Sequence, residues 1–186
     1  RHYLEPNPGS SIVATVAALE LFVESKTGPR TDAEIAFTHG LAKDLLSRKL
    51  LRSFPNTSNA EEAEDESDWR LLCFPRFYFY DVLRGLTAIT RYAERMNAQL
   101  REEDLAEAIS IVENKVKQGP LRIERDPLSE VRTLAPTPND WVREASRSFP
   151  LLRATNRVGE VSPHLNQEWN ETQKRIVRLR REKMIR

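Results

Sequence analysis

Residues 74–86 read FPRFYFYDVLRGL and place a carboxylate and a guanidinium beside a run of aromatic side chains. Asp81 and Arg84 lie three positions apart, so on a helix they would share one face. An arginine at that distance favours the ionised form of a carboxyl, which makes the carboxyl a poor proton donor. We therefore predict a buried ion pair between Asp81 and Arg84 that fixes the rotation of a helix. The alternative is a pocket carboxylate tuned by the adjacent arginine.

The aromatic side chains of this stretch could form a binding pocket or part of a core. They are Trp69, Phe74, Phe77, Tyr78, Phe79 and Tyr80. On a helix they would point in several directions, so packing between helices is the first expectation. If the stretch instead binds a hydrophobic ligand, the candidate ligand-binding residues are Phe77, Tyr78, Tyr80, Asp81 and Arg84.

Other residue types that could do chemistry are sparse. His2, His39 and His164 lie far apart and form no paired-ligand spacing, so we predict no metal site. Cys73 has apolar neighbours, which predicts a buried thiol with a raised pKa and little reactivity. The chain contains neither a phosphate-binding loop nor a Gly-x-Ser-x-Gly elbow. The sequence thus identifies no catalytic residue and no cofactor.

Composition and length are those of one globular domain. The chain has 186 residues, of which 39% are hydrophobic and 31% are charged, and its net charge is +1. We predict a single domain over residues 1–186. A net charge this small gives no global field that would attract nucleic acid, so we expect no nucleic-acid partner. No apolar run reaches the roughly 20 residues of a membrane span, and a single cysteine is compatible with a reducing compartment. We expect a cytoplasmic protein.

Most of the chain has helical periodicity, so helices are expected to position these residues. We predict helices over about residues 12–25, 32–52, 76–97, 101–118 and 167–185. The short break at Gly28 and Pro29 joins the first two helices into an αα-hairpin. The third and fourth helices form a second hairpin, which Gly119 and Pro120 end. The predicted fold class is therefore all-α, built from stacked antiparallel hairpins.

The first two helices carry the clearest local signals. Apolar residues of the first helix fall on two faces, Ile12, Val16, Leu19 and Val23 on one, and Val13, Ala17 and Leu21 on the other. A helix that is apolar on two sides is expected to be buried on two sides. Thr31 and Glu34 have the spacing of a capping box at the start of the second helix.

Less regular segments separate and follow these helices. Residues 60–68 read AEEAEDESD, which predicts a solvated or mobile acidic loop over about 56–68, with a cation or partner site as the alternative. Residues 138–147 could form a short helix, and residues 149–166 read as an irregular connection. The final helix, about 167–185, is rich in Lys and Arg, so contact with nucleic acid or an anionic membrane surface is its functional alternative.

The segment FPRFYFYDVLRGLTAI resembles a pattern, roughly FP-x-x-YYDVLRGL, of bacterial proteins of the prenyltransferase and squalene-cyclase repeat type. The flanking pieces PGSSIVATVAALELF, GLAKDLLSRKLLRS and LAEAISIVENKVKQGPLRIER are similar to helices of the same repeat. The resemblance covers about residues 8–126. It implies a partial α/α toroid or an arc of one, in which helix ends line a hollow that holds isoprenoid chains.

The motifs that carry catalysis in that group are missing here. No Asp-x-Asp-Asp motif occurs, and Leu71 stands where a prenyltransferase would have an Asp two positions before its zinc-binding Cys. After Gln118 and Gly119, Leu121 stands where the repeat has an aromatic residue. A full toroid would need about 300 residues, and this chain has room for about half of its hairpins.

These observations favour a non-catalytic or degenerate α/α-toroid domain that binds a hydrophobic, isoprenoid-like small molecule or a protein partner. One alternative is a fragment or subunit of a terpenoid- or prenyl-processing enzyme whose catalytic residues lie outside this chain. Another alternative is a basic interaction module that uses the C-terminal helix.

Overall fold

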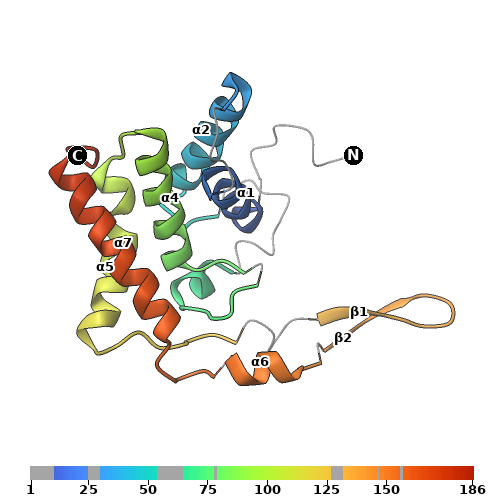
Figure 1. The fold of residues 1–186 in the computed structure, drawn as a ribbon. Coiled ribbons are helices and arrows are strands. Elements are labelled where there is room, and N and C mark those ends of the chain that lie inside the picture. Colours follow the sequence, from blue (N-terminus) through green and yellow to red (C-terminus); the bar gives the residue numbers. More distant parts are fainter. Residues whose placement is uncertain are drawn as a thin grey trace.

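The computed structural model of this chain describes residues 11–24, 30–53, 65–77, 79–126, 132–145, 147–155 and 157–186. Its elements are α1 (Ile12–Glu24), α2 (Asp32–Ser47), the 3-10 helix η2 (Asp65–Arg70), α4 (Val82–Met96), α5 (Glu102–Lys117), β1 (Arg132–Pro136), β2 (Trp141–Ala145), α6 (Pro150–Thr155) and α7 (Pro163–Arg181) (Figure 1). Most of the described residues are helical, which confirms the all-α class. The toroidal arrangement stays a prediction.

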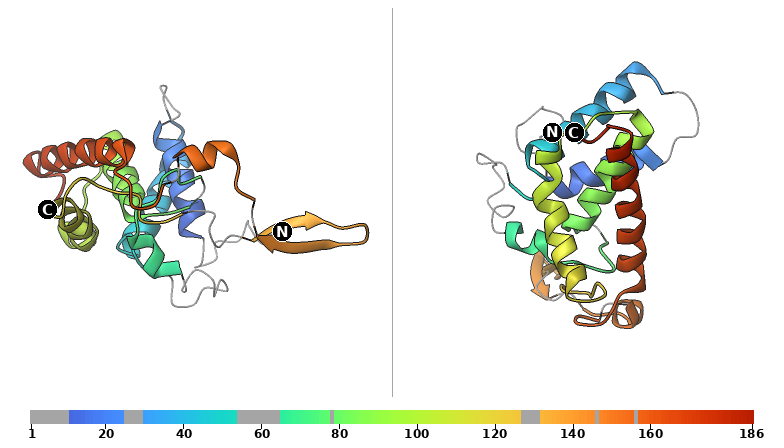
Figure 2. Two further views of the ribbon diagram at one scale, coloured as in Figure 1. Left: turned by 90° about the horizontal axis from the view of Figure 1, so that it is seen from below. Right: turned by 90° about the vertical axis from the view of Figure 1, so that its left-hand side faces the viewer.

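Helix α4 lies at the centre of the helices. It packs against α1, α2, α5 and α7, and the three views of the ribbon show these helices around it (Figures 1 and 2). Every residue from Val82 to Thr90 is buried, so this part of α4 has no face turned to water. At its other end, Asn97 takes the left-handed conformation that commonly ends a helix.

The local predictions for α1 and α2 are confirmed in part. The face of Ile12 and Val16 is buried, and the capping box forms, with the Thr31 backbone N–H donating to Glu34 Oε2 at 2.8 Å. The second face of α1 is not buried in the same way, because Leu21 is 60% exposed. Helix α2 ends at Ser47 rather than near residue 52.

The predicted start of the third helix, at residue 76, is wrong. Helix α4 begins at Val82, and Asp81 is its N-cap, with extended backbone angles of φ −142° and ψ 164°. Phe77 has a positive φ of 49°, so the backbone leaves the helical region before Asp81. Phe74, Phe77, Phe79 and Tyr80 therefore lie in a loop before α4, and helical phasing does not decide where their side chains point.

The acidic run is ordered over its described part. Asp65–Arg70 forms η2, Ser53 donates its backbone N–H to Glu66 Oε1 at 2.6 Å, and Asp68 pairs with Arg125 at 3.1 Å. This contradicts a fully solvated loop for these residues. The earlier part of the predicted acidic loop lies outside the described residues.

The short helix predicted over residues 138–147 is wrong, because this segment belongs to an antiparallel hairpin of β1 and β2. Thr137 and Asp140 close the turn: the Thr137 N–H donates to the Asp140 carbonyl at 2.7 Å, and the Asp140 N–H donates to Thr137 Oγ1 at 3.0 Å. The next residues, Trp141 and Val142, are types that favour strands. The hairpin extends away from the helices (Figures 1 and 2).

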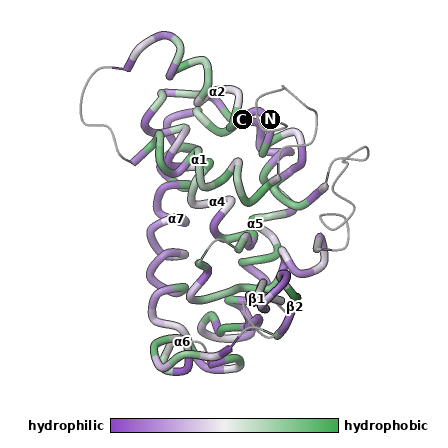
Figure 3. Tube along the Cα trace, turned by 90° about the vertical axis from the view of Figure 1, so that its right-hand side faces the viewer, coloured by the Kyte–Doolittle hydropathy of each residue, from purple (hydrophilic) through white to green (hydrophobic). Residues whose placement is uncertain are grey.

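Helix α7 begins four residues earlier than predicted. Ser162 is its N-cap and accepts a hydrogen bond from the Leu165 backbone N–H at 3.3 Å, and Pro163 occupies the first helical position. Figure 3 colours most of α7 as hydrophilic, and the apolar residues that it does carry, such as Trp169 and Ile176, are buried against the other helices. Within the described ranges, no helix combines the length and the apolar character needed to cross a bilayer.

Candidate functional site

Asp81 is fully buried, and its carboxylate accepts several hydrogen bonds at the start of α4. Its Oδ1 accepts from the Arg84 backbone N–H at 2.9 Å, and its Oδ2 accepts from the Cys73 backbone N–H at 3.1 Å and from Arg76 Nε at 2.6 Å. The ion pair of this carboxylate is thus with Arg76, in the loop before the helix. The predicted side-chain pair between Asp81 and Arg84 is wrong, because an N-cap carboxylate turns toward the first-turn amides rather than along the helix.

Arg84 instead joins α4 to α1. Its guanidinium makes two bonds to Glu20, from Nε at 2.8 Å and from Nη2 at 2.6 Å, and its Nη1 donates to the Phe79 carbonyl at 2.8 Å. Such paired, parallel bonds between Arg and a carboxylate fix geometry as well as adding energy. Arg84 therefore sets how α1 and α4 lie against each other.

The aromatic candidates point in different directions. Tyr80 is 1% exposed, donates its hydroxyl to the Leu50 carbonyl at 2.8 Å, and packs edge-on against Trp69. Phe77 is 47% exposed and lies near the ring of Phe149, with ring centres 6.1 Å apart. Tyr78 lies outside the described residues. The structure therefore does not bring Phe77 and Tyr80 into one pocket.

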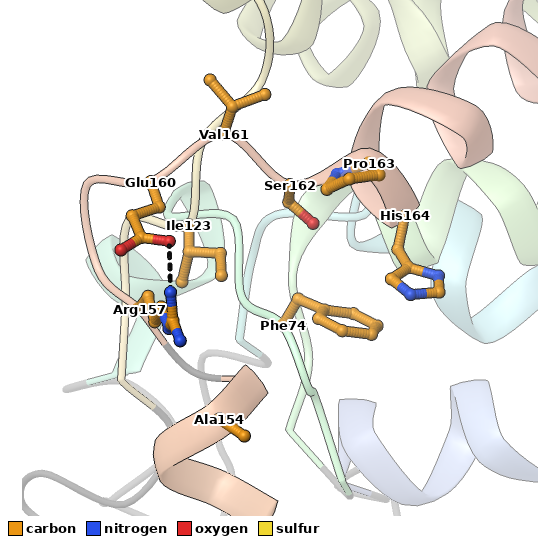
Figure 4. Close-up of a pocket in the computed structure, with 9 residues that line it drawn as sticks. All are labelled: Phe74, Ile123, Ala154, Arg157, Glu160, Val161, Ser162, Pro163 and His164. Carbon is orange, nitrogen blue, oxygen red and sulfur yellow. Dashed lines mark hydrogen bonds and ion pairs between the residues drawn. The ribbon is translucent and has the colours of Figure 1, made fainter.

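A cavity of about 320 Å³ opens beside another aromatic of the same stretch, Phe74 (Figure 4). Its lining residues are Phe74, Ile123, Ala154, Arg157, Glu160, Val161, Ser162, Pro163 and His164. They come from the loop before α4, the segment after α5, helix α6 and the start of α7. The rings of Phe74 and His164 stack with centres 4.5 Å apart, and Arg157 pairs with Glu160 at the rim.

Backbone hydrogen bonds hold the walls of this cavity together. The Ile123 N–H donates to the Glu160 carbonyl at 3.0 Å, and the Gly159 N–H donates to the Ile123 carbonyl at 2.7 Å. One step further, the Ser162 N–H donates to the Leu121 carbonyl at 3.0 Å. The segment that leads into α7 is therefore tied to the segment that follows α5, and the cavity lies in an ordered part of the chain.

Arg76, two residues after Phe74, belongs to a buried charge cluster in which two carboxylates share one guanidinium. Arg76 bonds to Asp81 and, through Nη1 at 2.8 Å, to Glu168 of α7. Burial raises the pKa of Glu168, and the nearby Asp81 charge raises it further. Burial, with a contribution from Asp81, also raises the pKa of the Cys73 thiol to about 12, and the thiol is buried as predicted.

The stability of Glu168→Gln relative to the wild type is expected to be higher at pH 8 than at pH 5. A carboxyl whose pKa is raised on folding binds its proton more tightly in the folded state, so its contribution to stability falls as pH rises above its ordinary value. The neutral amide removes that loss. The melting temperatures of the variant and the wild type, compared across this pH range, test it. Glu171→Gln, on the exposed side of the same helix, is the control. A pH-independent difference for Glu168→Gln would contradict the expectation.

Three arginines of α7 have carboxylate partners on the neighbouring helices. Arg175 and Arg178 both bind Glu94 of α4, and Arg180 binds Glu102 of α5. These pairs orient α7 on the bundle. They also reduce the positive charge that the helix presents to solvent.

The Phe74 cavity combines a largely apolar lining with a few polar side chains. Of the polar lining residues labelled in Figure 4, Arg157, Glu160 and His164 are exposed, whereas Ser162 is buried. Among the residues that the structure describes, no group of three or more His, Cys, Asp or Glu side chains could hold a metal ion.

The Phe74 cavity lies beside the stretch that the sequence singled out, but its lining does not include Phe77, Tyr80, Asp81 or Arg84. Phe74 was one of the noted aromatics, whereas Ile123, Val161 and His164 carry no pattern that marks them as a site. They gather only because the segments after α5 and before α7 pair with each other.

The comparisons with known proteins found no similarity. No family model matches the chain, and no curated protein and no solved structure matches it significantly.

Proposed function

We propose that this chain is a non-catalytic binding domain of the cytoplasm, and that its Phe74 cavity holds the apolar part of a small hydrophobic molecule. The observation that carries the proposal is the cavity itself, which has largely apolar walls and a few polar side chains. The free and buried Cys73 is compatible with a reducing compartment.

The size and the lining of the cavity support this role. Small-molecule sites commonly occupy about 300 to 1,000 Å³ and combine hydrophobic walls with a small number of polar groups. The cavity of about 320 Å³ lies at the lower end of that range, which suits one apolar chain or ring. Phe74 offers a ring already held in place by its stack on His164, so a ligand would not have to order it. The resemblance to the prenyltransferase and squalene-cyclase repeat favours an isoprenoid-like chain.

Farnesol, an isoprenoid alcohol, is the probe that tests this proposal. We expect native mass spectrometry to detect a one-to-one complex and farnesol to displace an apolar fluorescent dye. Ala154→Trp should weaken both by about tenfold or more, because the indole would occupy the cavity. Leu151→Trp is the matched control, because this residue lies on the same helix α6, is 65% exposed and does not line the cavity.

Two results would overturn the proposal. One is an absence of farnesol binding by the wild-type protein, and the other is equal farnesol affinity in Ala154→Trp and Leu151→Trp. Circular dichroism of both variants keeps a folding defect from being mistaken for lost binding.

A further inference from the structure

A second cavity, of about 310 Å³, lies near the other end of α4 and is lined mainly by charged side chains. Val23 and Glu24 come from α1; Arg91, Glu94 and Arg95 come from α4; and Arg175 comes from α7. Arg175 lies 12 residues beyond Pro163 of the Phe74 cavity, which corresponds to about 18 Å along α7. The two cavities are therefore separate.

Positive charge exceeds negative charge in and around this second cavity. Arg91 pairs with Glu24, and Glu94 is shared by Arg175 and by the neighbouring Arg178. Arg95 has no carboxylate partner among the described residues, although it lies one helical turn from Arg91. Four guanidiniums thus share two carboxylates, and like charges at this spacing repel one another.

Arg175 shows the effect of this crowding. Its side chain is only 13% exposed, and it is held by Glu94 at 3.1 Å and by the Thr90 hydroxyl at 3.4 Å. Its pKa is lowered, mainly by burial, which outweighs the opposing effect of Glu94; the neighbouring charges of Arg91 and Arg178 lower it further. An additional anion in the cavity would therefore stabilise the charged guanidinium of Arg175.

We propose that the cavity of Arg91, Arg95 and Arg175 binds a phosphate-type oxyanion, either inorganic phosphate or the phosphate group of a small monoester. Guanidinium groups present parallel N–H donors that match phosphate oxygens, and they bind phosphate more specifically than a point charge does. The cavity volume accommodates a phosphate group and leaves room for an organic substituent. Glu24 and Glu94 reduce the net charge but are already engaged by arginines.

Isothermal titration calorimetry and thermal shift with sodium phosphate test this proposal. We expect phosphate to bind and to raise the melting temperature more than sodium chloride of the same ionic strength does. Arg95→Gln should weaken phosphate binding by about tenfold, since one charged hydrogen-bonding group is lost. Arg181→Gln is the control, because its side chain is 76% exposed at the end of α7 and lies outside the cavity lining.

Glu94→Gln tests the proposal through an expected increase, rather than a decrease, in phosphate affinity. It removes a negative charge from the cavity and should tighten phosphate binding, even though it lowers the melting temperature of the free protein by breaking the pairs with Arg175 and Arg178. Titration with glycerol phosphate distinguishes the two sources: tighter binding than inorganic phosphate assigns a monoester, and equal binding assigns the phosphate group alone. A thermal shift no larger than that of chloride, or unchanged phosphate affinity in Arg95→Gln, would overturn the proposal.

Discussion

Gly85→Ala is expected to lower the free energy of unfolding by about 3 kcal/mol or more. An added Cβ at this position would lie 2.0 Å from the Tyr80 hydroxyl oxygen and 2.9 Å from its Cζ atom. The ring has no room to retreat, because Tyr80 is buried, bonds to the Leu50 carbonyl and packs on Trp69. Either α4 shifts away from the loop or the Tyr80 hydrogen bond breaks. Urea unfolding followed by circular dichroism measures the loss.

Gly40→Ala is the matched control for this prediction. Gly40 also lies within a helix, α2, but an added Cβ there meets nothing within 4 Å. The change should leave stability unaltered or raise it by up to about 1 kcal/mol, because alanine is the better helix former. In the double variant Gly85→Ala/Tyr80→Phe, loss of the hydroxyl removes the shortest contact and should restore part of the stability. Equal effects of Gly85→Ala and Gly40→Ala would contradict the account of α4 packing.

Asp81→Ala is expected to lower the free energy of unfolding by about 3 to 5 kcal/mol. The change removes the N-cap of α4 and leaves the buried backbone N–H groups of Cys73 and Arg84 without their acceptor. It also leaves the guanidinium of Arg76 with Glu168 as its one remaining ionic partner among the described residues. Chemical unfolding of the purified variant measures the loss.

Thr31→Ala separates the contribution of the cap from that of the buried charge. Thr31 caps α2 with the same kind of hydrogen bond, but it is exposed and has no buried ion pair. Its loss should cost about 1 kcal/mol, the usual value for a helix cap. If Asp81→Ala costs no more than Thr31→Ala does, the buried pair with Arg76 contributes nothing to stability.

The features that could be predicted from the sequence depend on residues only a few positions apart in the chain. The buried face of α1 at Ile12 and Val16 follows from residue spacing, and the Thr31 capping box follows from two residues three positions apart. The start of α4 was misplaced although a local rule could have placed it: Asp81 is a favoured N-cap type directly before Val82. The aromatic residues, which are compatible with a helix, drew the predicted boundary too far toward the N-terminus.

The two cavities could not be predicted in this way. The Phe74 cavity needs Ile123 to pair with the segment before α7, and the arginine cavity needs Arg175 to lie beside Arg91. Residue spacing in the sequence does not indicate either contact, because each contact joins segments that are separated by several helices and strands. The hairpin was missed for a different reason: residues 138–147 start with proline and contain helix formers, and only the pairing with β1 selects the strand.

The central position of α4 implies that different parts of the domain unfold at different free energies. Its contacts reach far along the chain, since Arg84 and Glu20 are 64 residues apart and Thr87 and Thr172 are 85 residues apart. Contacts of this range form late and raise the folding barrier through the entropy of chain closure. Backbone amides in the middle of α4 should therefore exchange with deuterium only when the whole domain unfolds, whereas those of the β1–β2 hairpin should exchange through local opening.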